Sequence, residues 1–362
     1  MTEFTHYILS PEVVLTGPGC RHAAAPVIEG LGRRAFVLGD AAGLVVAASL
    51  LDAFQERDIV AHQRTFHGEC TEAAITDTAR AARGFDLFIG VGGGKAIDTA
   101  KAAAVAASIP CVTVPTSPAT CAAYTPLSIL HDERGGYVES RRLPTTLAAM
   151  ILDPELMIGA PGRLLSAGCV DALARSWDTL LAARSRVPSS MAALSISVCQ
   201  RVWEETLCPL AAQAIEDGRR GDVTPAFTDV VEACIIGAGL AGQLGARFFG
   251  RSFSHALGYA LAGFVDSAAV LHGEAVGLGI LLQCALDEQS TVSLEDMVTY
   301  FRSLGAPARF ADIGFKGLSG EDGRTLASAT YDLLDLDAAV PFPVTVEDLY
   351  RGLLAVEAAA EA

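Results

Sequence analysis

Three consecutive glycines follow a short apolar run in the first third of this chain. Leu87–Val91 predicts a buried strand, and helix-forming residues begin at Lys95. Between them lie Gly92, Gly93 and Gly94. Glycine adopts positive φ without strain and lets a bulky anion approach the backbone, while the free N–H groups of a helix start favour negative charge. The turn therefore predicts a diphosphate site, although the same tight turn also occurs in α/β proteins that bind no phosphate.

Apolar runs alternate with amphipathic segments over the first 160 residues. The expected strands are Arg34–Leu38, Ile59–Arg64, Leu87–Val91, Cys111–Val114 and Met150–Asp153, with helices at Gly43–Glu56, Thr71–Arg83 and Ala96–Ser108. This alternation predicts right-handed crossovers and a mostly parallel sheet whose ligands bind at the carboxyl ends of the strands. We predict an α/β nucleotide-binding domain over residues 1–160. Tyr7–Leu9 and Val13–Thr16 are expected to form an antiparallel ribbon at its edge.

Helical periodicity replaces the strand signals after Pro161, which predicts an all-helical domain over residues 161–362. The expected helices are Gly168–Ala183, Ser189–Ile215, Thr224–Leu240 and Ser252–Ala262, with capped helix starts at Ser293 and Thr345. Breaks between helices are expected at Glu216–Gly218 and at Pro341–Pro343.

The composition limits the partners of the chain. Its 26 basic and 42 acidic residues give a net charge of −16, which repels nucleic acids and anionic membrane surfaces. Apolar runs such as Ala233–Gly242 fall short of the ~18–20 residues that a membrane span needs. Nine cysteines without a C-x-x-C pair indicate reduced thiols. We therefore expect a cytoplasmic protein that acts on a small molecule, and its 51% hydrophobic residues suggest a homo-oligomer.

Three residues of the helical half form a candidate metal site. His255 and His272 lie among small apolar residues, and Asp171 lies near the expected start of a long apolar helix. One carboxylate and two neutral imidazoles are a common ligand set for a catalytic Zn²⁺ with an open fourth position. Each residue also has a structural interpretation: either histidine can be a satisfied core residue, and Asp171 can be stabilised by the positive end of its helix.

Several segments, in order and spacing, resemble the glycerol dehydrogenase branch of the iron-containing, or group III, alcohol dehydrogenase family. They are Phe66–Cys70, Gly90–Lys101, Val114–Thr116, Leu127–Ser128, Ala160–Ala174 and His272–Glu274. The resemblance implies a nucleotide-binding domain, a helical domain of dehydroquinate synthase-like architecture, and a cleft where NAD(P) meets a divalent metal. It implies Asp171, His255 and His272 as metal ligands, and the donor set accepts both Zn²⁺ and Fe²⁺.

The resemblance also implies the residues that bind the cofactor. Gly92, Gly93, Gly94 and Lys95 would hold the diphosphate, and Asp98, Thr116, Thr125 and Leu127 would lie along the cofactor. Asp40 stands where an acid can accept a hydrogen bond from the adenosine ribose. A carboxylate there repels a 2′-phosphate, which favours NAD and leaves NADP open.

The chain departs from the family at the expected substrate site. Cys121 replaces an aspartate of glycerol dehydrogenases, His131 replaces a common tyrosine, and Gly258–Tyr259 replaces a His-Asn pair. The segment around Cys121 and Tyr124 looks more like the subgroup that handles 2-hydroxy and 2-oxo acids. Cys121, Tyr124 and His131 are thus candidate substrate residues, Cys121 being alternatively a buried structural thiol.

The resulting hypothesis is the reversible oxidation of a small secondary alcohol, a polyol or a 2-hydroxy acid, by hydride transfer to NAD(P). Water can carry the proton, with His131 or Tyr124 as a relay. The alternative is a metal- and NAD-dependent cyclase or lyase of the dehydroquinate-synthase type, which needs basic residues for a phosphorylated substrate, whereas Phe253–Leu286 contains no Lys or Arg. A non-catalytic NAD-binding protein is a third alternative.

Overall fold

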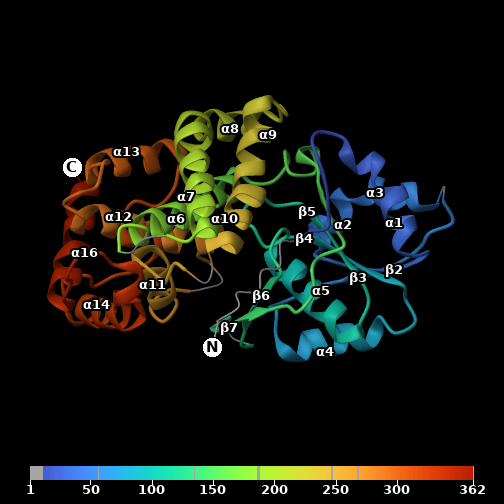
Figure 1. The fold of residues 1–362 in the computed structure, drawn as a ribbon, viewed down its shortest axis with the longest axis horizontal. Helices are drawn as coiled ribbons and strands as arrows, with labels where there is room; N and C mark the ends of the chain where they lie inside the picture. The colour runs from blue at the N-terminus through green and yellow to red at the C-terminus, as the bar shows by residue number, and fades with distance from the viewer. Residues whose placement is uncertain are drawn as a thin grey trace.

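The chain folds into a sheet-containing half followed by a helical half (Figure 1). The computed structural model describes residues 11–55, 57–133, 135–185, 188–245, 248–266 and 269–361. All strands of the described chain lie before Asp153, and only helices and connecting segments follow Gly162. The predicted fold class, a mostly parallel α/β domain plus a helical domain, is confirmed.

The main sheet has six strands in the order β1-β8-β5-β4-β2-β3, and every neighbouring pair is parallel. Its strands are β1 (Val13–Thr16), β2 (Arg34–Gly39), β3 (Val60–Thr65), β4 (Leu87–Gly92), β5 (Cys111–Pro115) and β8 (Ala149–Leu152). Successive side chains point to opposite faces, so Val37 and Ile89 join one apolar cluster while Phe36 and Phe88 join another. The central strands β4 and β5 are therefore buried on both faces, as strands of parallel sheets are, whereas the edge strands β1 and β3 are partly exposed.

The helices of the N-terminal half cover these faces. They are α1 (Ala25–Leu31), α2 (Ala41–Val46), α3 (Ala48–Gln55), α4 (Glu72–Ala81) and α5 (Gly94–Ala107), with short 3₁₀ turns at Cys20–Ala23 and Pro154–Leu156. The helix predicted at Gly43–Glu56 is thus divided between α2 and α3.

One prediction for this half needs correction, and one feature was missed. Val13–Thr16 is not part of an antiparallel ribbon: it pairs in parallel with β8, far away in the sequence, and Tyr7–Leu9 lies outside the described residues. A second sheet, the antiparallel pair β6 (Leu127–His131) and β7 (Tyr137–Arg142), was not predicted. Five of the six β7 residues are exposed, so this strand has no apolar pattern to reveal it.

The C-terminal half is a layered helical core (Figure 1). Its main helices are α6 (Gly162–Ala182), α7 (Ser190–Arg201), α8 (Cys208–Arg220), α9 (Pro225–Glu232), α10 (Ala238–Gly245), α11 (Phe253–Leu261), α12 (His272–Leu286), α13 (Leu294–Leu304), α14 (Glu321–Leu333), α15 (Leu336–Ala339) and α16 (Val346–Glu361). π-helical segments join α7 to α8 (Val202–Leu207) and α9 to α10 (Ala233–Gly237), and a 3₁₀ turn covers Phe310–Ile313. Ser293 and Thr345 accept hydrogen bonds from Asp296 N and Asp348 N as predicted.

Because α9, its π segment and α10 are continuous, the helical stretch Pro225–Gly245 is longer than the apolar run in the sequence suggested. Its 21 residues and mean hydropathy of 1.3 satisfy the length and composition of a membrane span. However, 61% of its most apolar window is buried, and α10 packs against α6 and α7. The stretch is a core helix of the fold.

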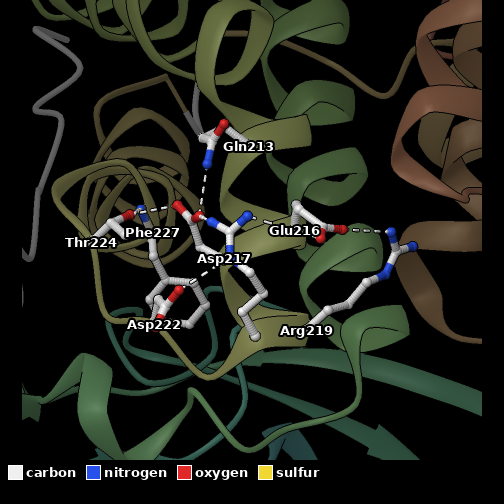
Figure 2. A network of polar contacts seen from close by, with 8 residues as sticks. Gln213, Glu216, Asp217, Arg219, Asp222, Thr224 and Phe227 are labelled. Atoms are coloured by element: carbon white, nitrogen blue, oxygen red, sulfur yellow. Dashed lines mark hydrogen bonds and ion pairs between the residues drawn. The ribbon is translucent and has the colours of Figure 1, made fainter.

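The break expected at Glu216–Gly218 is wrong, since α8 continues to Arg220 and ends at Gly221. The buried Asp217 accepts hydrogen bonds from Gln213 Nε2 (2.7 Å), Thr224 Oγ1 (2.6 Å) and Arg220 (Figure 2). These partners satisfy a carboxylate that would otherwise favour a turn. The network fixes the corner between α8 and α9.

The cysteines match the prediction of reduced thiols. All nine are free, and six of them are buried: Cys70, Cys111, Cys169, Cys199, Cys234 and Cys284.

A buried lysine holds the segment that leads from β5 toward the helical half. Lys101 of α5 has a side chain that is 0% exposed, and its ammonium donates to the carbonyls of Ala122 (2.7 Å), Thr125 (3.1 Å) and Leu127. It also forms a 2.7 Å ion pair with Asp98, whose other oxygen accepts from Ile129 N. A buried charge persists only when it is paired and hydrogen-bonded in this way.

We expect Lys101→Met to destabilise the protein by about 3–5 kcal/mol, because it leaves the Asp98 carboxylate buried without its cation. The Lys101→Met/Asp98→Asn pair should lose less than the sum of the two single variants. Urea unfolding of these variants measures both effects, with Lys316→Met, at an exposed lysine, as the control. Additive losses would contradict the pairing.

Candidate metal and nucleotide site

Asp171, His255 and His272 converge in the helical half, one from each of α6, α11 and α12. Each offers one ligand atom, and these three atoms lie within 4.8 Å of one another. Asp171 Oδ1 is 3.5 Å from His272 Nε2. Ligand atoms held about 2.0–2.1 Å from a tetrahedral Zn²⁺ lie about 3.3 Å apart, so the spacing fits a single ion.

Close packing brings these helices together. At Gly273, the second residue of α12, a Cβ would lie 1.9 Å from the carbonyl oxygen of Ala167 in α6, so only glycine allows this approach. Glu274 forms a bidentate ion pair with Arg163 in the first turn of α6, and it also accepts a hydrogen bond from Leu271 N (2.9 Å). The start of α12, which carries His272, is thereby fixed on α6.

The sequence suggested that Asp171 lies near a helix start, but the structure places it elsewhere. α6 begins at Gly162, so the carboxylate is in the helix interior and gains nothing from the helix terminus. The residue is 8% exposed, and among the described residues its one polar contact is with His272. A buried carboxylate without a hydrogen-bond donor needs a cation, which supports the metal interpretation.

A carboxylate that sequence analysis missed orients His255. Asp178 Oδ2 lies 2.7 Å from His255 Nδ1, and Asp178 Oδ1 accepts a hydrogen bond from Ser254 N (3.2 Å). The contact assigns the proton to Nδ1 and turns the lone pair of Nε2 toward the cluster, as in carboxylate–histidine–metal triads. The signal was available: Asp178 lies seven residues after Asp171, on the same face of an apolar helix.

The surroundings keep His272 neutral, as a metal ligand must be. Burial lowers the pKa of its imidazole, and repulsion from His255 and Arg175 lowers it further, against the attraction of Asp171. Its side chain is 39% exposed, so one edge faces solvent while protein surrounds the rest. Tyr259 also packs near both histidines, with ring centroids 6.3 Å from His255 and 6.2 Å from His272.

The glycine turn lies at the carboxyl ends of neighbouring strands β2 and β4, where the strand order reverses. Gly92 has φ 121°, and a Cβ there would lie 2.0 Å from Asp40 Oδ2, so the position requires glycine. Asp40 caps α2 by accepting from Gly43 N (2.7 Å) and also accepts from Gly93 N (3.0 Å). The structure thus brings the predicted ribose acid and the predicted diphosphate turn together.

The predicted diphosphate residues begin α5. No side chain caps this helix, whose N-terminus follows Gly93. Lys95 is 52% exposed, and its ammonium forms an ion pair with Glu69. Gly93 N already donates to Asp40, so the positive end of the site is offered by the N–H groups that follow, from Gly94 on, whereas the charge of Lys95 is shared with an acid.

The other predicted cofactor residues differ in how close they lie to the glycine turn and in whether their side chains are already paired. Thr116 N donates to Gly92 O (3.2 Å), which places it beside the glycines. Asp98, Thr125 and Leu127 belong to the Lys101 network, where Asp98 is 5% exposed and paired. The side chain of Asp98 therefore has a structural role, whereas Thr116 borders the site.

One segment borders both the turn and the metal cluster. At Gly94, a Cβ would lie 3.2 Å from Thr120 Oγ1, so this part of the segment touches the start of α5. The next residue, Cys121, lies close enough to Asp171 and Arg175 for both charges to act on its thiol, whose pKa is raised to about 12 mainly by burial. Cys121 is therefore a neutral thiol between the two parts of the site.

The two remaining candidates, Tyr124 and His131, have different neighbours. Tyr124 packs against α10, since a Cβ at Gly239 would lie 2.6 Å from Tyr124 Cδ1, and burial raises the pKa of its hydroxyl. His131 lies with its Nδ1 4.0 Å from Glu69 Oε2, next to the Lys95 pair.

Comparison with known proteins identifies the family. A model described as iron-containing alcohol dehydrogenase matches residues 11–154. A glycerol dehydrogenase from Pseudomonas putida is 31% identical over 89% of this chain and 87% of its own length. The chain belongs to the iron-containing alcohol dehydrogenase family.

Further relatives place it in the glycerol dehydrogenase-like branch of this family. Hydroxycarboxylate dehydrogenase A of Escherichia coli (strain K12) is 34% identical over 68% of both chains. The solved structure of a probable glycerol dehydrogenase from Sinorhizobium meliloti 1021 is 28% identical, covers 97% of this chain and 98% of its own, and has a TM-score of 0.82. The predicted resemblance is confirmed: the protein is an oxidoreductase of the alcohol dehydrogenase type, and its family implies NAD(P) and a divalent metal.

We expect Asp178→Asn to weaken zinc binding by about 10- to 100-fold, because the amide no longer fixes the proton on His255 Nδ1. Competition with a chromogenic chelator measures the zinc dissociation constant. The control is Asp229→Asn, at an exposed position of α9. Unchanged zinc affinity in a folded Asp178→Asn protein would show that His255 needs no orienting carboxylate.

Proposed function

We propose that this alcohol dehydrogenase interconverts a small secondary alcohol, a polyol or a 2-hydroxy acid, with its ketone by hydride transfer to and from NAD. The supporting observation is the position of Thr120 and Cys121. Thr120 lies against Gly94 of the glycine turn, and the next residue, Cys121, lies close enough to Asp171 for that charge to act on its thiol. A nucleotide bound at the glycine turn and a metal ion bound at Asp171 would both lie next to this segment. Hydride transfer requires such proximity between the cofactor and the metal-bound substrate.

In the proposed mechanism, Asp171, His255 and His272 hold the metal. A divalent ion supplies Lewis acidity, which lowers the pKa of an alcohol hydroxyl and polarises a ketone. Asp178 keeps His255 in the tautomer that leaves Nε2 free, and the Arg163–Glu274 pair keeps His272 in place. Zn²⁺ is the proposed ion, and Fe²⁺ is accepted by the same donors.

The proposed nucleotide site consists of Gly92, Gly93, Gly94 and Lys95 for the diphosphate, with Thr116 alongside. Asp40 accepts hydrogen bonds from two backbone N–H groups, which hold its carboxylate at the end of β2. The carboxylate favours a free ribose over a phosphorylated one, so NAD is the proposed cofactor and NADP the weaker one.

Proton transfer is proposed to use water rather than a direct side-chain base. Neither relay candidate contacts a metal ligand directly: Tyr124 is 9% exposed and packs against α10, and the nearest acid to the His131 ring is Glu69. His131 lies close enough for its charge to act on His272, which makes it the better relay of the two.

The cyclase or lyase of the dehydroquinate-synthase type is disfavoured by the family assignment, as is a non-catalytic NAD-binding protein. We further propose that the enzyme is cytoplasmic and forms a homo-oligomer. The high share of hydrophobic residues, 51%, supports an oligomer.

Chelation with EDTA should abolish the oxidation of NADH by a panel of 2-oxo acids, hydroxyketones and aldehydes, and added Zn²⁺ should restore it. We expect His272→Ala to lose bound metal and to lower kcat/KM by about 100-fold or more. Metal analysis and NADH absorbance measure the two effects, with His22→Ala, at an exposed position, as the control. Retention of both metal and full activity by His272→Ala would refute the site.

Cofactor choice tests the role of Asp40. The protein should prefer NADH to NADPH, and Asp40→Asn should reduce this preference by about tenfold, because repulsion of a 2′-phosphate is lost. The ratio of kcat/KM for the two cofactors measures it, with Asp52→Asn, at an exposed position of α3, as the control. An unchanged ratio would place the ribose elsewhere.

A further inference from the structure

Arg175 lies at the metal cluster, although sequence analysis gave it no role. It follows Asp171 by one turn on the same face of α6, and its side chain is half-buried. Arg175 Nη2 is 3.4 Å from His255 Nε2. None of the ion pairs between described residues involves Arg175, whereas Arg163 and Arg184 of the same half each hold a carboxylate.

A bound metal would leave this arginine without its acceptor. Asp178 occupies His255 Nδ1, so the lone pair of Nε2 serves either Arg175 or a metal ion, but not both. A divalent ion held by one carboxylate and two neutral imidazoles leaves one net positive charge, and the guanidinium adds a second. Even with the buried Asp178 carboxylate behind His255 counted, the site keeps one net positive charge, which favours an anionic guest.

The neighbouring side chain adds no negative charge. Cys121 lies close to both Asp171 and Arg175, and a cysteine side chain offers a neutral thiol where another residue could offer a carboxylate. A carboxylate at this position would pair with Arg175. The thiol instead leaves the guanidinium free to bind a ligand.

We propose that Arg175 binds the carboxylate of the substrate and thereby selects 2-hydroxy acids and 2-oxo acids over polyols and neutral ketones. This inference rests on the proposed function. In a 2-hydroxy acid the carboxylate is attached to the carbon that carries the reacting oxygen, which matches an arginine next to a metal ligand. In the oxidation, the hydrogen on C2 leaves as hydride to NAD⁺, the hydroxyl proton goes to solvent, and the products are the 2-oxo acid and NADH.

Two substrates of nearly equal shape test the proposal. Both pyruvate and 1-hydroxypropan-2-one are methyl ketones. Next to the ketone, pyruvate has a carboxylate and 1-hydroxypropan-2-one has a neutral hydroxymethyl group. We expect the wild-type enzyme to prefer pyruvate and Arg175→Met to reduce the ratio of the two kcat/KM values by about 10- to 100-fold, chiefly through KM for pyruvate. Arg175→Lys should keep part of the preference, since an ammonium retains the charge without the planar fork.

Binding experiments separate this role from a structural one. Calorimetry with oxamate, an unreactive analogue of a 2-oxo acid, should give a dissociation constant about 10- to 100-fold higher for zinc- and NADH-loaded Arg175→Met than for wild type. Zinc content should be unchanged, because the variant removes a positive charge and no ligand. Arg201→Met, at an exposed arginine of α7, is the control.

The outcomes distinguish the two proposals. Equal loss on both ketones, or loss of zinc, in Arg175→Met would overturn the role of Arg175 and leave the dehydrogenase intact. If Arg175→Met does not fold, an unchanged substrate ratio in folded Arg175→Lys would overturn it. If wild type binds zinc and NADH but reduces neither ketone, the proposed function fails. In that case oxamate binding still tests the anion site, and an equal affinity of wild type and Arg175→Met for oxamate would refute it.

Discussion

The buried ammonium of Lys101 is the interaction on which both halves of the site depend. It holds one segment through the carbonyls of Ala122, Thr125 and Leu127, and Asp98 balances its charge. The same helix, α5, begins at the glycine turn. One helix therefore carries the proposed anion site at its end and fixes the segment next to the candidate metal ligands, so we expect the spacing between the two proposed sites to depend on this helix.

A second helix arranges the chemistry. Asp171, Arg175 and Asp178 lie at positions i, i+4 and i+7 of α6, on one face of a helix that is otherwise largely apolar and buried. A buried structural helix would have aliphatic residues there, since unpaired charges in such a place are costly. The three residues instead divide the tasks of the site: one is a candidate metal ligand, one is a cation beside it, and one orients His255. Departures from local rules of this kind are expected at functional sites.

The sequence predicts those parts of the structure that depend on local patterns. The parallel sheet follows from alternation of apolar runs and helices, the turn at Gly92 from its glycines, and the caps at Ser293 and Thr345 from residue spacing. Features that depend on distant partners are not predicted: β1 pairs with β8, which lies far away in the sequence, and β7 has no apolar face. The chain bends after Gly221 rather than near Asp217, because Thr224 and Gln213 satisfy that carboxylate in three dimensions. The roles of Asp178 and Arg175 needed both the helix face and the position of His255.

The charge of the whole protein and that of the site have opposite signs, and the two act over different ranges. A net charge of −16 opposes anions at long range, but salt screens exposed charges beyond about 8 Å at physiological ionic strength. Within that range the start of α5, the candidate metal ligands and Arg175 are the groups that we propose select the ligand. The ion pair between Lys95 and Glu69 fits this arrangement, because a partly exposed pair of this kind is worth about 1 kcal/mol or less. Lys95 can therefore exchange Glu69 for a phosphate at little cost, so the acid keeps the lysine beside the turn without blocking it.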